Sequence, residues 1–507
     1  MNNIRIVKLK RNTMSSLVFQ VTTMLSGFVL PRLILETYGS SVNGIVNSVA
    51  QYLQIIAFLE LGVGAVIQSS LYRPLAENDG KKISEILSSG EKFFRKIATV
   101  LVVYIIILLF IYPRIVKSQF DVLFTISLIL AMGISYFSQY YFGVIDRLLL
   151  TADQRGYIQY NAQTITLVAN MFASIILMKC GVSIQIVKLT TSLLYLVRPI
   201  FLRLYVNKHY NVNRKQKYDK EPIEQKWNGF AQHIAAVVLD STDNIVLTIF
   251  STLQNVSIYS VYHLVVYGLK TLFLSLTGGI QSLMGELWAK DEKEKLEVVF
   301  SNYEWLVHTI TTLLFGCTSI LIVPFVQVYT KGITDSNYIQ PLFGFILTYA
   351  NAGHCLRLPY NHMILAAGHY KQTQYNYIIA MMMNIIISCL TVIKFGLIGV
   401  AIGTLIAMMY QTVWMAIYVL RKLLKFNVFL FVKQILVDAI IILLSTIISK
   451  WLTLGSVTIW NWILLGFKTV AIWSIVSGLL NAIFYREKIK SVILFILKNK
   501  KMRSEKQ

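Results

Sequence analysis

The sequence predicts an all-α polytopic membrane protein with about 14 transmembrane helices, arranged as two parallel six-helix bundles facing a central cavity plus two extra C-terminal helices. Three observations lead to this fold class: the composition, a series of long apolar segments and an internal repeat. Of the 507 residues, 56% are hydrophobic and only 14% are charged. Soluble domains average about 45–50% apolar and about 25% charged residues. This composition cannot cover a water-exposed surface, and it excludes a soluble enzyme.

Fourteen segments are long and apolar enough to cross a bilayer, which requires about 20 residues each. In chain order they are 14–37, 42–66, 96–116, 120–144, 158–179, 183–206, 229–252, 256–284, 303–329, 339–367, 373–393, 397–420, 431–453 and 461–485. Several of them, beginning with 14–37, have Ser, Thr, Asn and Gln along one face. A helix anchored in lipid does not need such groups, whereas a helix that lines a water-filled cavity does.

Lys and Arg are concentrated on one side of the predicted membrane. The N-terminal tail and every second loop carry 34 of the 47 basic residues, and the opposite loops carry 6. Because cytoplasmic loops are rich in Lys and Arg, we predict that both termini are cytoplasmic. The formal net charge of +23 is then a topology signal and does not indicate nucleic-acid binding. The basic tail runs directly into the first span, so we expect no cleavable signal peptide.

Segments of the first half recur in the second half of the chain. The aligned pairs are 59–95 with 272–308, at an offset of 213, and 152–181 with 367–396, at an offset of 215. The first alignment places Glu91 opposite Glu304, and the second places Gly181 opposite Gly396. An even number of spans separates the copies, so both halves share one orientation, as in many transporters that work by alternating access. A duplication without transport, as in some membrane enzymes, stays open.

The repeat and the charge pattern divide the chain into six segments. We expect a cytoplasmic tail at 1–13, an N-terminal six-helix bundle at 14–206, a basic cytoplasmic linker at 207–228, a C-terminal six-helix bundle at 229–421, two extra helices at 431–485 and a basic cytoplasmic tail at 486–507. The sequence has no phosphate-binding loop, zinc-binding HExxH or dinucleotide-binding turn. Its four cysteines lie far apart, without a CxxC pair. We therefore expect no enzyme, no catalytic residues, no metal and no cofactor.

Six segments carry a resemblance to a known family. They are RLILETYGSSVNGI (32–45), ELGVGAVIQSSLYRPLAENDGKKI (60–83), DQRGYIQY (153–160), STDNIVLTIFSTLQNVSIYSVYHLV (241–265), AAGHYKQTQYNYI (366–378) and GLIGVAIGTLIAM (396–408). Together with the spans and the repeat, they make the chain from about residue 14 to 421 resemble the oligosaccharide-lipid flippases of the multidrug/oligosaccharidyl-lipid/polysaccharide exporter superfamily. The likeness is strongest to flippases for bacterial O-antigen or capsule repeat units. The chain departs from this pattern at 285–290, where GELWAK replaces the Leu-Tyr-Arg-Pro of the first copy.

The resemblance implies a function, a location and partners. Such flippases move polyprenyl-diphosphate-linked oligosaccharide repeat units from the inner to the outer leaflet of the bacterial plasma (inner) membrane, for assembly of cell-surface polysaccharide. They use no nucleotide, and some related members couple transport to Na⁺ or H⁺. The implied partners are lipid-linked oligosaccharide, the lipid bilayer, a polysaccharide polymerase and glycosyltransferases. At about 0.8 kcal/mol per CH₂, withdrawing the polyprenyl tail from lipid is prohibitive, so only the sugar and diphosphate would cross a polar cavity.

Four basic residues within the spans are candidate ligands for the diphosphate: Arg32, Arg198, Lys270 and Arg357. Ionisable groups inside a membrane are costly and mark functional sites by default, and arginine can hold a phosphate through two hydrogen bonds. Structural roles stay open, because Arg32 can pair with Glu36 four residues further on. The remaining basic residues of the spans, which include Lys188, Arg203 and Lys468, are expected to lie near the interface or to serve packing.

Three acidic residues are candidates for ion coupling or for counter-charges: Glu60, Asp240 and Asp243. Asp240 and Asp243 lie three residues apart on one face of the seventh span. They can either bind a coupling cation or neutralise Lys270 on the next span. Glu60 matches a family position or simply anchors the turn that it begins. The pair Glu304 and His308 is expected to be interfacial.

Alternative functions remain within and outside this superfamily. One alternative is a flippase of the peptidoglycan lipid precursor, and another is a cation-coupled exporter of amphipathic drugs. Cationic drugs favour an acidic lumen, whereas the basic candidates here outnumber the acidic ones and favour an anionic cargo. A membrane-embedded polysaccharide polymerase or ligase is the least favoured, since such an enzyme needs a large outer loop that the chain lacks.

Overall fold

The computed structural model describes residues 3–56, 63–116, 119–218, 221–222 and 230–490. These residues form helices and turns, with no β-strand among them. The predicted class, an all-α polytopic membrane protein, is therefore confirmed. The chain separates into two compact units: unit 1 is Met1–Ser260 with Gly332–Ser336, and unit 2 is Val261–Lys331 with Asn337–Gln507.

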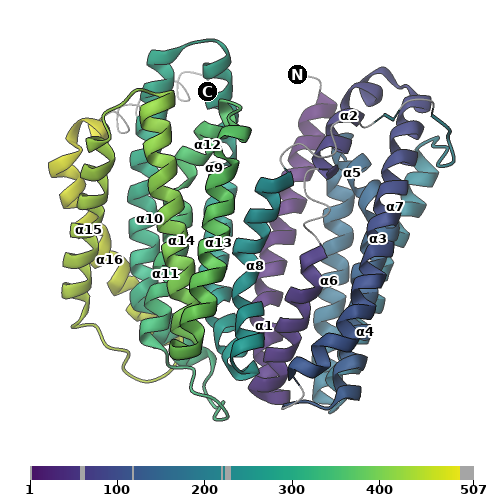
Figure 1. Cartoon of the computed structure of the whole chain (residues 1–507), viewed down its shortest axis with the longest axis horizontal. Coiled ribbons are helices and arrows are strands. Elements are labelled where there is room, and N and C mark those ends of the chain that lie inside the picture. Colours follow the sequence, from purple (N-terminus) through teal and green to yellow (C-terminus); the bar gives the residue numbers. More distant parts are fainter. Residues whose placement is uncertain (1–2, 57–62, 117–118, 219–220, 223–229, 491–507) are drawn as a thin grey trace. The chain divides into compact units, whose positions relative to one another are not determined.

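Unit 1 contains eight α-helices, a short π-helix and the beginning of a ninth α-helix, counted over the described residues (Figure 1). They are α1 (Asn3–Gln54), α2 (Val63–Glu77), α3 (Gly80–Val116), α4 (Val122–Ser138), the π-helix η2 (Gln139–Gly143), α5 (Val144–Ala152), α6 (Gly156–Lys179), α7 (Ile184–His209), α8 (Phe230–Phe250) and the first part of α9 (Leu253–Ala289). Helix α1 is interrupted at Gly39, which has a φ of 83°. A Cβ atom there would lie 2.8 Å from Oδ2 of Asp335, so both the backbone and the space require glycine.

Small and polar residues let the helices of unit 1 approach closely. At Gly44, a Cβ atom would lie 1.8 Å from the carbonyl oxygen of Leu253, so the backbones of α1 and α9 touch there. One turn further on, the hydroxyls of Ser48 and Thr248 are 2.7 Å apart. Interfaces of this kind, with small residues and hydrogen-bonded polar side chains, are typical of helix packing in membranes. Polar residues of the predicted span 42–66 therefore also serve packing.

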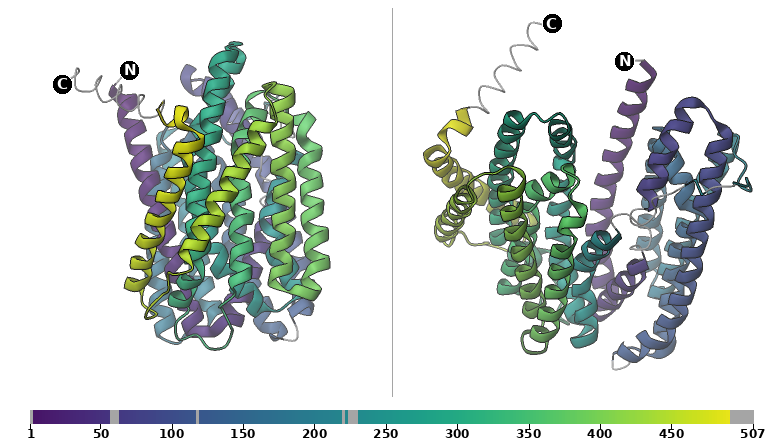
Figure 2. Two further views of the ribbon diagram at one scale, coloured as in Figure 1. Left: turned by 90° about the vertical axis from the view of Figure 1, so that its left-hand side faces the viewer. Right: turned by 45° about the horizontal axis from the view of Figure 1, so that its top comes forward.

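Unit 2 contains the rest of α9 and the helices that follow it. They are α10 (Lys293–Tyr329), α11 (Pro341–Leu356), α12 (Leu358–Ala366), α13 (Tyr370–Phe395), α14 (Leu397–Tyr418), the π-helix η3 (Val419–Leu423), α15 (Phe429–Ser449) and α16 (Ile459–Phe484). Helices α15 and α16 lie side by side and pack against α10 (Figures 1 and 2). Gly316 on α10 makes room for the fully buried ring of Trp473 on α16, because a Cβ atom would lie 1.8 Å from that ring.

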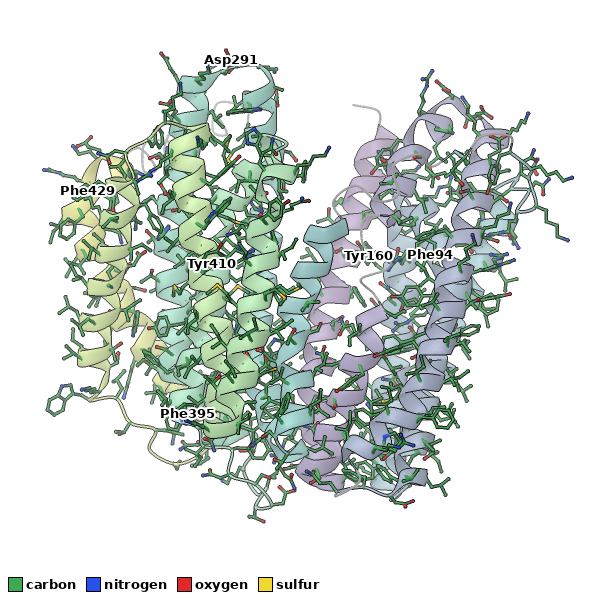
Figure 3. All side chains as sticks on the ribbon, in the orientation of Figure 1. Phe94, Tyr160, Asp291, Phe395, Tyr410 and Phe429 are labelled. Atoms are coloured by element: carbon green, nitrogen blue, oxygen red, sulfur yellow. The ribbon has the colours of Figure 1, made fainter. Side chains whose placement is uncertain are left out.

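Eleven helices in the described part of the chain are long and apolar enough to cross a membrane. The prediction of fourteen spans differs at three places. α1 combines two predicted spans across the Gly39 bend, span 339–367 is divided into α11 and α12, and span 229–252, which corresponds to α8, is not among the eleven. Large apolar side chains cover outward faces of the helices. Phe395 and Phe429, labelled in Figure 3, are 56% and 64% exposed, as expected for side chains that contact lipid.

Three helices are longer than the predicted spans. α3, α9 and α10 have 37 residues each, which is about 55 Å at 1.5 Å per residue and exceeds a hydrocarbon core of about 30 Å. Segments 67–96 and 285–302, expected as loops, are therefore mostly helical and are broken only by tight turns. Their charged residues continue the helices beyond the apolar part.

The turns of the first half recur with the same backbone geometry in the second half. Asn78 and Asp291, 213 residues apart, have φ angles of 54° and 55°. The hydrogen bonds of these turns also correspond. The bond from Asp79 N to Pro74 O matches the bond from Glu292 N to Leu287 O, and the bond from Arg155 N to Leu150 O matches the bond from His369 N to Ile364 O, one residue away from the aligned offset of 215. Gly181 and Gly396, paired in the sequence alignment, both have positive φ angles. The repeat seen in the sequence therefore extends to the backbone of these turns.

Candidate substrate-binding cavity

A cavity with several polar side chains in its lining lies inside unit 1, where α4, η2 and α5 meet α6 and α7. The π-helical turn widens the backbone at Gln139–Gly143, and such turns are frequent at functional sites. Gly143, which ends this turn, faces Pro199 of α7, and a Cβ atom on it would lie 3.1 Å from the Cβ of Pro199. The absence of a side chain at Gly143 thus allows α7 to approach the turn. The wider turn and the close approach together position the side chains that surround the cavity.

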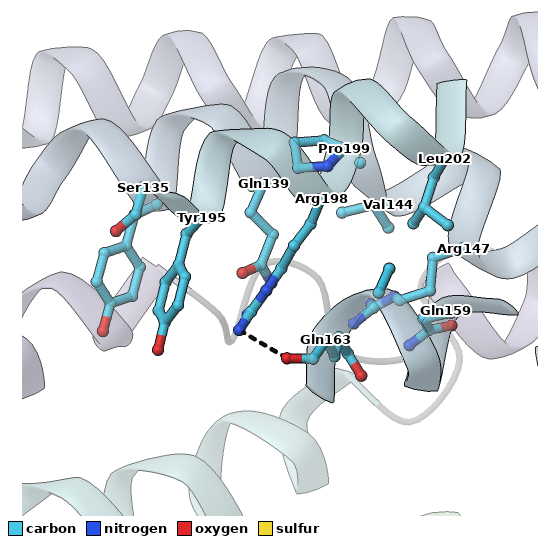
Figure 4. Close-up of a pocket in the computed structure, with 13 residues that line it drawn as sticks. Ser135, Gln139, Val144, Arg147, Gln159, Gln163, Tyr195, Arg198, Pro199 and Leu202 are labelled. Atoms are coloured by element: carbon cyan, nitrogen blue, oxygen red, sulfur yellow. Dashed lines mark hydrogen bonds between the residues drawn. The ribbon is translucent and has the colours of Figure 1, made fainter. Parts of the chain in front are cut away.

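The cavity has a volume of about 270 Å³ and a lining of both polar and apolar surface (Figure 4). The lining residues are Ser135, Tyr136, Gln139, Gly143, Val144, Arg147, Gln159, Ala162, Gln163, Tyr195, Arg198, Pro199 and Leu202. Two of them are arginines and three are glutamines, and no carboxylate occurs among the described residues that line it. The cavity is therefore cationic and rich in hydrogen-bonding groups, a combination suited to an anionic or sugar-like ligand.

Arg198 is held in the cavity by three interactions. Its Nε donates to the hydroxyl of Thr166, and its Nη2 donates to the carbonyl oxygen of Gln163 at 3.4 Å. The guanidinium carbon lies 3.8 Å from the centre of the Tyr195 ring, in a cation–π contact. The two hydrogen bonds use two of the five N–H groups of the guanidinium. The fork is thus fixed in orientation, and part of its donor capacity remains for a ligand.

The predicted residues Lys270 and Arg357 lie in a second cationic cluster, inside unit 2. Lys270 is 4% exposed and Arg357 is 6% exposed. Nη2 of Arg357 is 3.1 Å from Nδ1 of His354, and Lys270 interacts electrostatically with the same imidazole. Arg357 lies at the junction of α11 and α12, just before Pro359, which cannot donate the next helical hydrogen bond. The break in this span therefore coincides with buried positive charge.

Arg32 and Asp243 have partners within unit 1. Nη2 of Arg32 lies 2.6 Å from Oε1 of Glu36, the ion pair that was the structural alternative for this arginine. Asp243 is buried and accepts a hydrogen bond of 2.8 Å from the hydroxyl of Tyr259. The side chain of Asp240 and the whole of Glu60 lie outside the described residues. Arg32 and Arg198 belong to unit 1, and Lys270 and Arg357 to unit 2, so their convergence on one cavity stays a prediction.

Several polar residues of these sites were not singled out from the sequence. Arg147 belonged to a predicted loop, although it lines the cavity with Gln139. The pair Gln159 and Gln163 could have been found, because residues four apart on a helix share one face and both fall on a predicted span.

Glu304 and His308, expected to be interfacial, are buried within unit 2, and their depth in the membrane stays a prediction. Their exposed fractions are 8% and 0%, because α15 packs against α10. Arg203, expected near the interface, is one-quarter exposed and pairs with the buried Glu91 at 2.6 Å.

Buried polar clusters lie within bundles of long apolar helices, and comparisons with solved structures identify the fold. The chain is similar to the lipid II flippase MurJ in an inward closed conformation, with 15% sequence identity and a TM-score of 0.66, over 94% of this chain and 99% of MurJ. It is also similar to a multidrug resistance MATE family transporter of the MOP superfamily in an inward-facing conformation, with 16% identity and a TM-score of 0.58, over 82% and 98% of the two chains.

A third similar structure is a MOP superfamily transporter from Pyrococcus furiosus with a binding pocket of reversed polarity, at 14% identity and a TM-score of 0.53, over 82% of this chain and 96% of that one. No family model and no curated protein matches the sequence. The chain has the fold of the MOP superfamily transporters, as its resemblance to oligosaccharide-lipid flippases predicted.

Proposed function

We propose that the protein is a flippase that moves polyprenyl-diphosphate-linked oligosaccharide repeat units from the inner to the outer leaflet by alternating access. The observation that carries this proposal is the cavity of unit 1, which presents Arg147 and Arg198 with three glutamines and, among its described lining, no carboxylate. Guanidinium groups bind phosphate oxygens, and amides and hydroxyls bind sugar hydroxyls. A cationic drug would instead favour acidic groups in such a cavity. The fold shared with a lipid II flippase supports transport of a lipid-linked cargo.

The proposal includes the finer architecture and setting. It comprises fourteen spans in a plan of six, six and two, both termini in the cytoplasm, and the bacterial inner membrane as location. The linker at 207–228 divides the two bundles in this plan. Glycosyltransferases and a polysaccharide polymerase would act before and after the flippase. The four basic residues Arg32, Arg198, Lys270 and Arg357 would meet the diphosphate, and Asp240, Asp243 and Glu60 would serve as counter-charges or in coupling to Na⁺ or H⁺.

A second candidate is a flippase of the peptidoglycan lipid precursor. The observation that favours it is the similarity to MurJ along nearly the whole chain. Both candidates need a site for a diphosphate, and they differ in the sugar. A transport assay with two lipids therefore separates them.

The experiment uses the full chain in liposomes that contain either a polyprenyl-diphosphate oligosaccharide or lipid II, and it measures the lipid that reaches the opposite leaflet. Arg198→Ala removes hydrogen bonds to a charged group, worth about 1.5–3 kcal/mol each, and should slow transport roughly 10- to 100-fold. Arg198→Lys should recover only part of the rate, because lysine lacks the planar fork. The exposed Lys468 gives the control Lys468→Ala.

Loss of transport in Arg198→Ala but not in Lys468→Ala would support an anion site in unit 1. Transport of lipid II alone would select the second candidate. Transport of a cationic dye, with neither lipid moved, would contradict both proposals. Equal rates for the wild type and Arg198→Ala would exclude this arginine from the substrate site.

A further inference from the structure

Four buried titratable side chains form a hydrogen-bonded relay that connects three helices of unit 2. Nδ1 of His308 on α10 lies 2.6 Å from Oδ2 of Asp438 on α15. Nε2 of the same ring lies 3.4 Å from the hydroxyl of Tyr360 on α12, and this hydroxyl donates to Oε1 of Glu304 on α10 at 2.7 Å. Between 0% and 8% of each residue is exposed. The substrate cavity of unit 1 uses none of these groups.

The hydrogen bonds within this relay indicate how many protons its four side chains hold. The single proton of Tyr360 is given to Glu304, so the phenol oxygen offers only lone pairs to Nε2 of His308. An ionised Asp438 likewise offers only lone pairs to Nδ1. Both links are satisfied when His308 carries protons on both nitrogens and is an imidazolium between the carboxylate of Asp438 and the phenol of Tyr360.

The same number of protons also satisfies a second arrangement. If Nε2 passes its proton to the oxygen of Tyr360 while Tyr360 passes its own proton to Glu304, the imidazole becomes neutral and Glu304 becomes a carboxylic acid. No bond other than these O–H and N–H bonds forms or breaks, and no proton leaves the relay. One proton can therefore lie at either end of the relay, with Tyr360 between them.

Other polar and charged groups lie around the relay. Gln434 of α15 donates to Oδ1 of Asp438 at 3.3 Å, and Lys433 of the same helix lies over the ring of Tyr485, which interacts with both carboxylates. Lys488 donates to the carbonyl oxygen of Ser301 at 2.6 Å, one turn before Glu304. Burial lowers the pKa of Lys488, against the opposing effect of Glu304.

The apolar surroundings exclude water from the relay. The rings of Phe300 and Phe431 lie 6.0 and 5.7 Å from the ring of Tyr360, and Phe431 also lies 6.4 Å from His308. Nδ1 of His362 on α12 lies 2.9 Å from the hydroxyl of Tyr303, which is outside the relay. Removing the proton would leave two carboxylates beside neutral partners in a site of low polarity, which is unfavourable.

We propose that Glu304, Tyr360, His308 and Asp438 bind one exchangeable proton, and that its loss loosens α15 from α10 and α12. Because Asp438 is contributed by α15, only the docked arrangement assembles the complete site. The docked state therefore binds the proton more tightly than the undocked state, and docking weakens as the pH rises. A use of this proton to drive transport would rest on the proposed function, whereas proton binding itself does not.

The test is NMR of the full chain in nanodiscs, with ¹⁵N-labelled histidine, from about pH 5 to about pH 9, where histidine ordinarily changes charge. His308→Gln identifies the resonances of His308 by their disappearance. The wild type should show an imidazolium at low pH that loses one proton as the pH rises. Asp438→Asn should lower the midpoint of this transition by about one pH unit or more. The exposed Glu286 gives the matched control Glu286→Gln, which should leave the midpoint unchanged.

Hydrogen exchange of residues 429–449 in the same samples, corrected for the intrinsic pH dependence of amide exchange, reports the docking of α15. Protection should fall in the pH range where His308 loses its proton. Tyr360→Phe keeps the shape of the side chain but removes the hydroxyl that connects His308 with Glu304. In this background, Glu304→Gln should no longer shift the midpoint of the His308 transition. A neutral His308 at every pH, or a midpoint identical in the wild type and Asp438→Asn, would overturn the proposal whatever the protein transports.

Discussion

Glu91 and Glu304 occupy equivalent positions of the internal repeat, 213 residues apart, but their surroundings differ. Glu91 lies 2.6 Å from Nη1 of Arg203 and also pairs with Arg214. Glu304 accepts a hydrogen bond from the phenol of Tyr360. Arginine keeps its charge at every physiological pH. Glu304 is instead connected through Tyr360 to His308, and histidine changes its charge near physiological pH. The same position is thus a permanent ion pair in one half and part of a titratable chain in the other.

In both halves, the residue that completes the cluster comes from outside the repeat. Arg214 belongs to the predicted linker and also binds Oδ1 of the fully buried Asp146 at 2.6 Å. Asp438 belongs to α15, one of the two extra helices. The duplicated scaffold therefore fixes the backbone turns, and segments added to it determine the chemistry at equivalent positions.

The packing of the linker on unit 1 strengthens this contrast. The hydroxyl of Tyr210 donates to Asp153 at 2.5 Å, and burial together with this hydrogen bond raises the pKa of Tyr210. The backbone N–H of Asn213 donates to the hydroxyl of Ser84 at 3.0 Å. The first part of the linker is thus a packed element of unit 1, in which shortening should harm folding as well as transport.

The largest effect is expected from Arg214→Ala. This change leaves the carboxylates of Glu91 and Asp146 buried with fewer partners, and removal of one member of a buried ion pair costs about 3–5 kcal/mol. The thermal stability of the purified chain should fall strongly at pH 7. The neighbouring Lys215 is exposed, and Lys215→Ala should leave the stability unchanged. Equal stability of the two variants would show that Arg214 does not hold unit 1 together.

A direct comparison of the two glutamates should give an intermediate effect. Glu91→Gln removes the charge that neutralises Arg203 and Arg214, and we expect it to reduce the free energy of unfolding by about 1–3 kcal/mol. Glu304→Gln keeps an acceptor for Tyr360, so its cost should stay below about 1 kcal/mol. Measurement of both variants at two salt concentrations sharpens the comparison. Equal losses would mean that Glu304 also depends on its charge for stability.

The sequence predicted what depends on composition and periodicity, and it missed what depends on long-range packing. The apolar segments gave the membrane class, and the alignment of Glu91 with Glu304 gave a repeat that recurs in the backbone turns. The burial of His308 could not be predicted, because its partner Asp438 lies 130 residues away on a helix outside the repeat. For the same reason, no local pattern connected Arg198 with Thr166 or with the π-helical turn at Gln139–Gly143.

The smallest expected effect tests the repeat itself, at Asn78 and Asp291. Both residues adopt a left-handed conformation, with φ angles of 54° and 55°, and this conformation costs an ordinary side chain about 1–2 kcal/mol. Asn and Asp tolerate it better than alanine does, so Asn78→Ala and Asp291→Ala should each lower the free energy of unfolding by up to about 1 kcal/mol. Asn78→Gly and Asp291→Gly should change it less, because glycine accepts positive φ but gains freedom in the unfolded chain.

Lys81, exposed beside the first turn, supplies the control Lys81→Ala. If the two turns are copies of one ancestral element, the alanine and glycine series should run in parallel at both sites in thermal unfolding. Opposite signs at Asn78 and Asp291 would mean that the matching φ angles do not reflect equivalent turns.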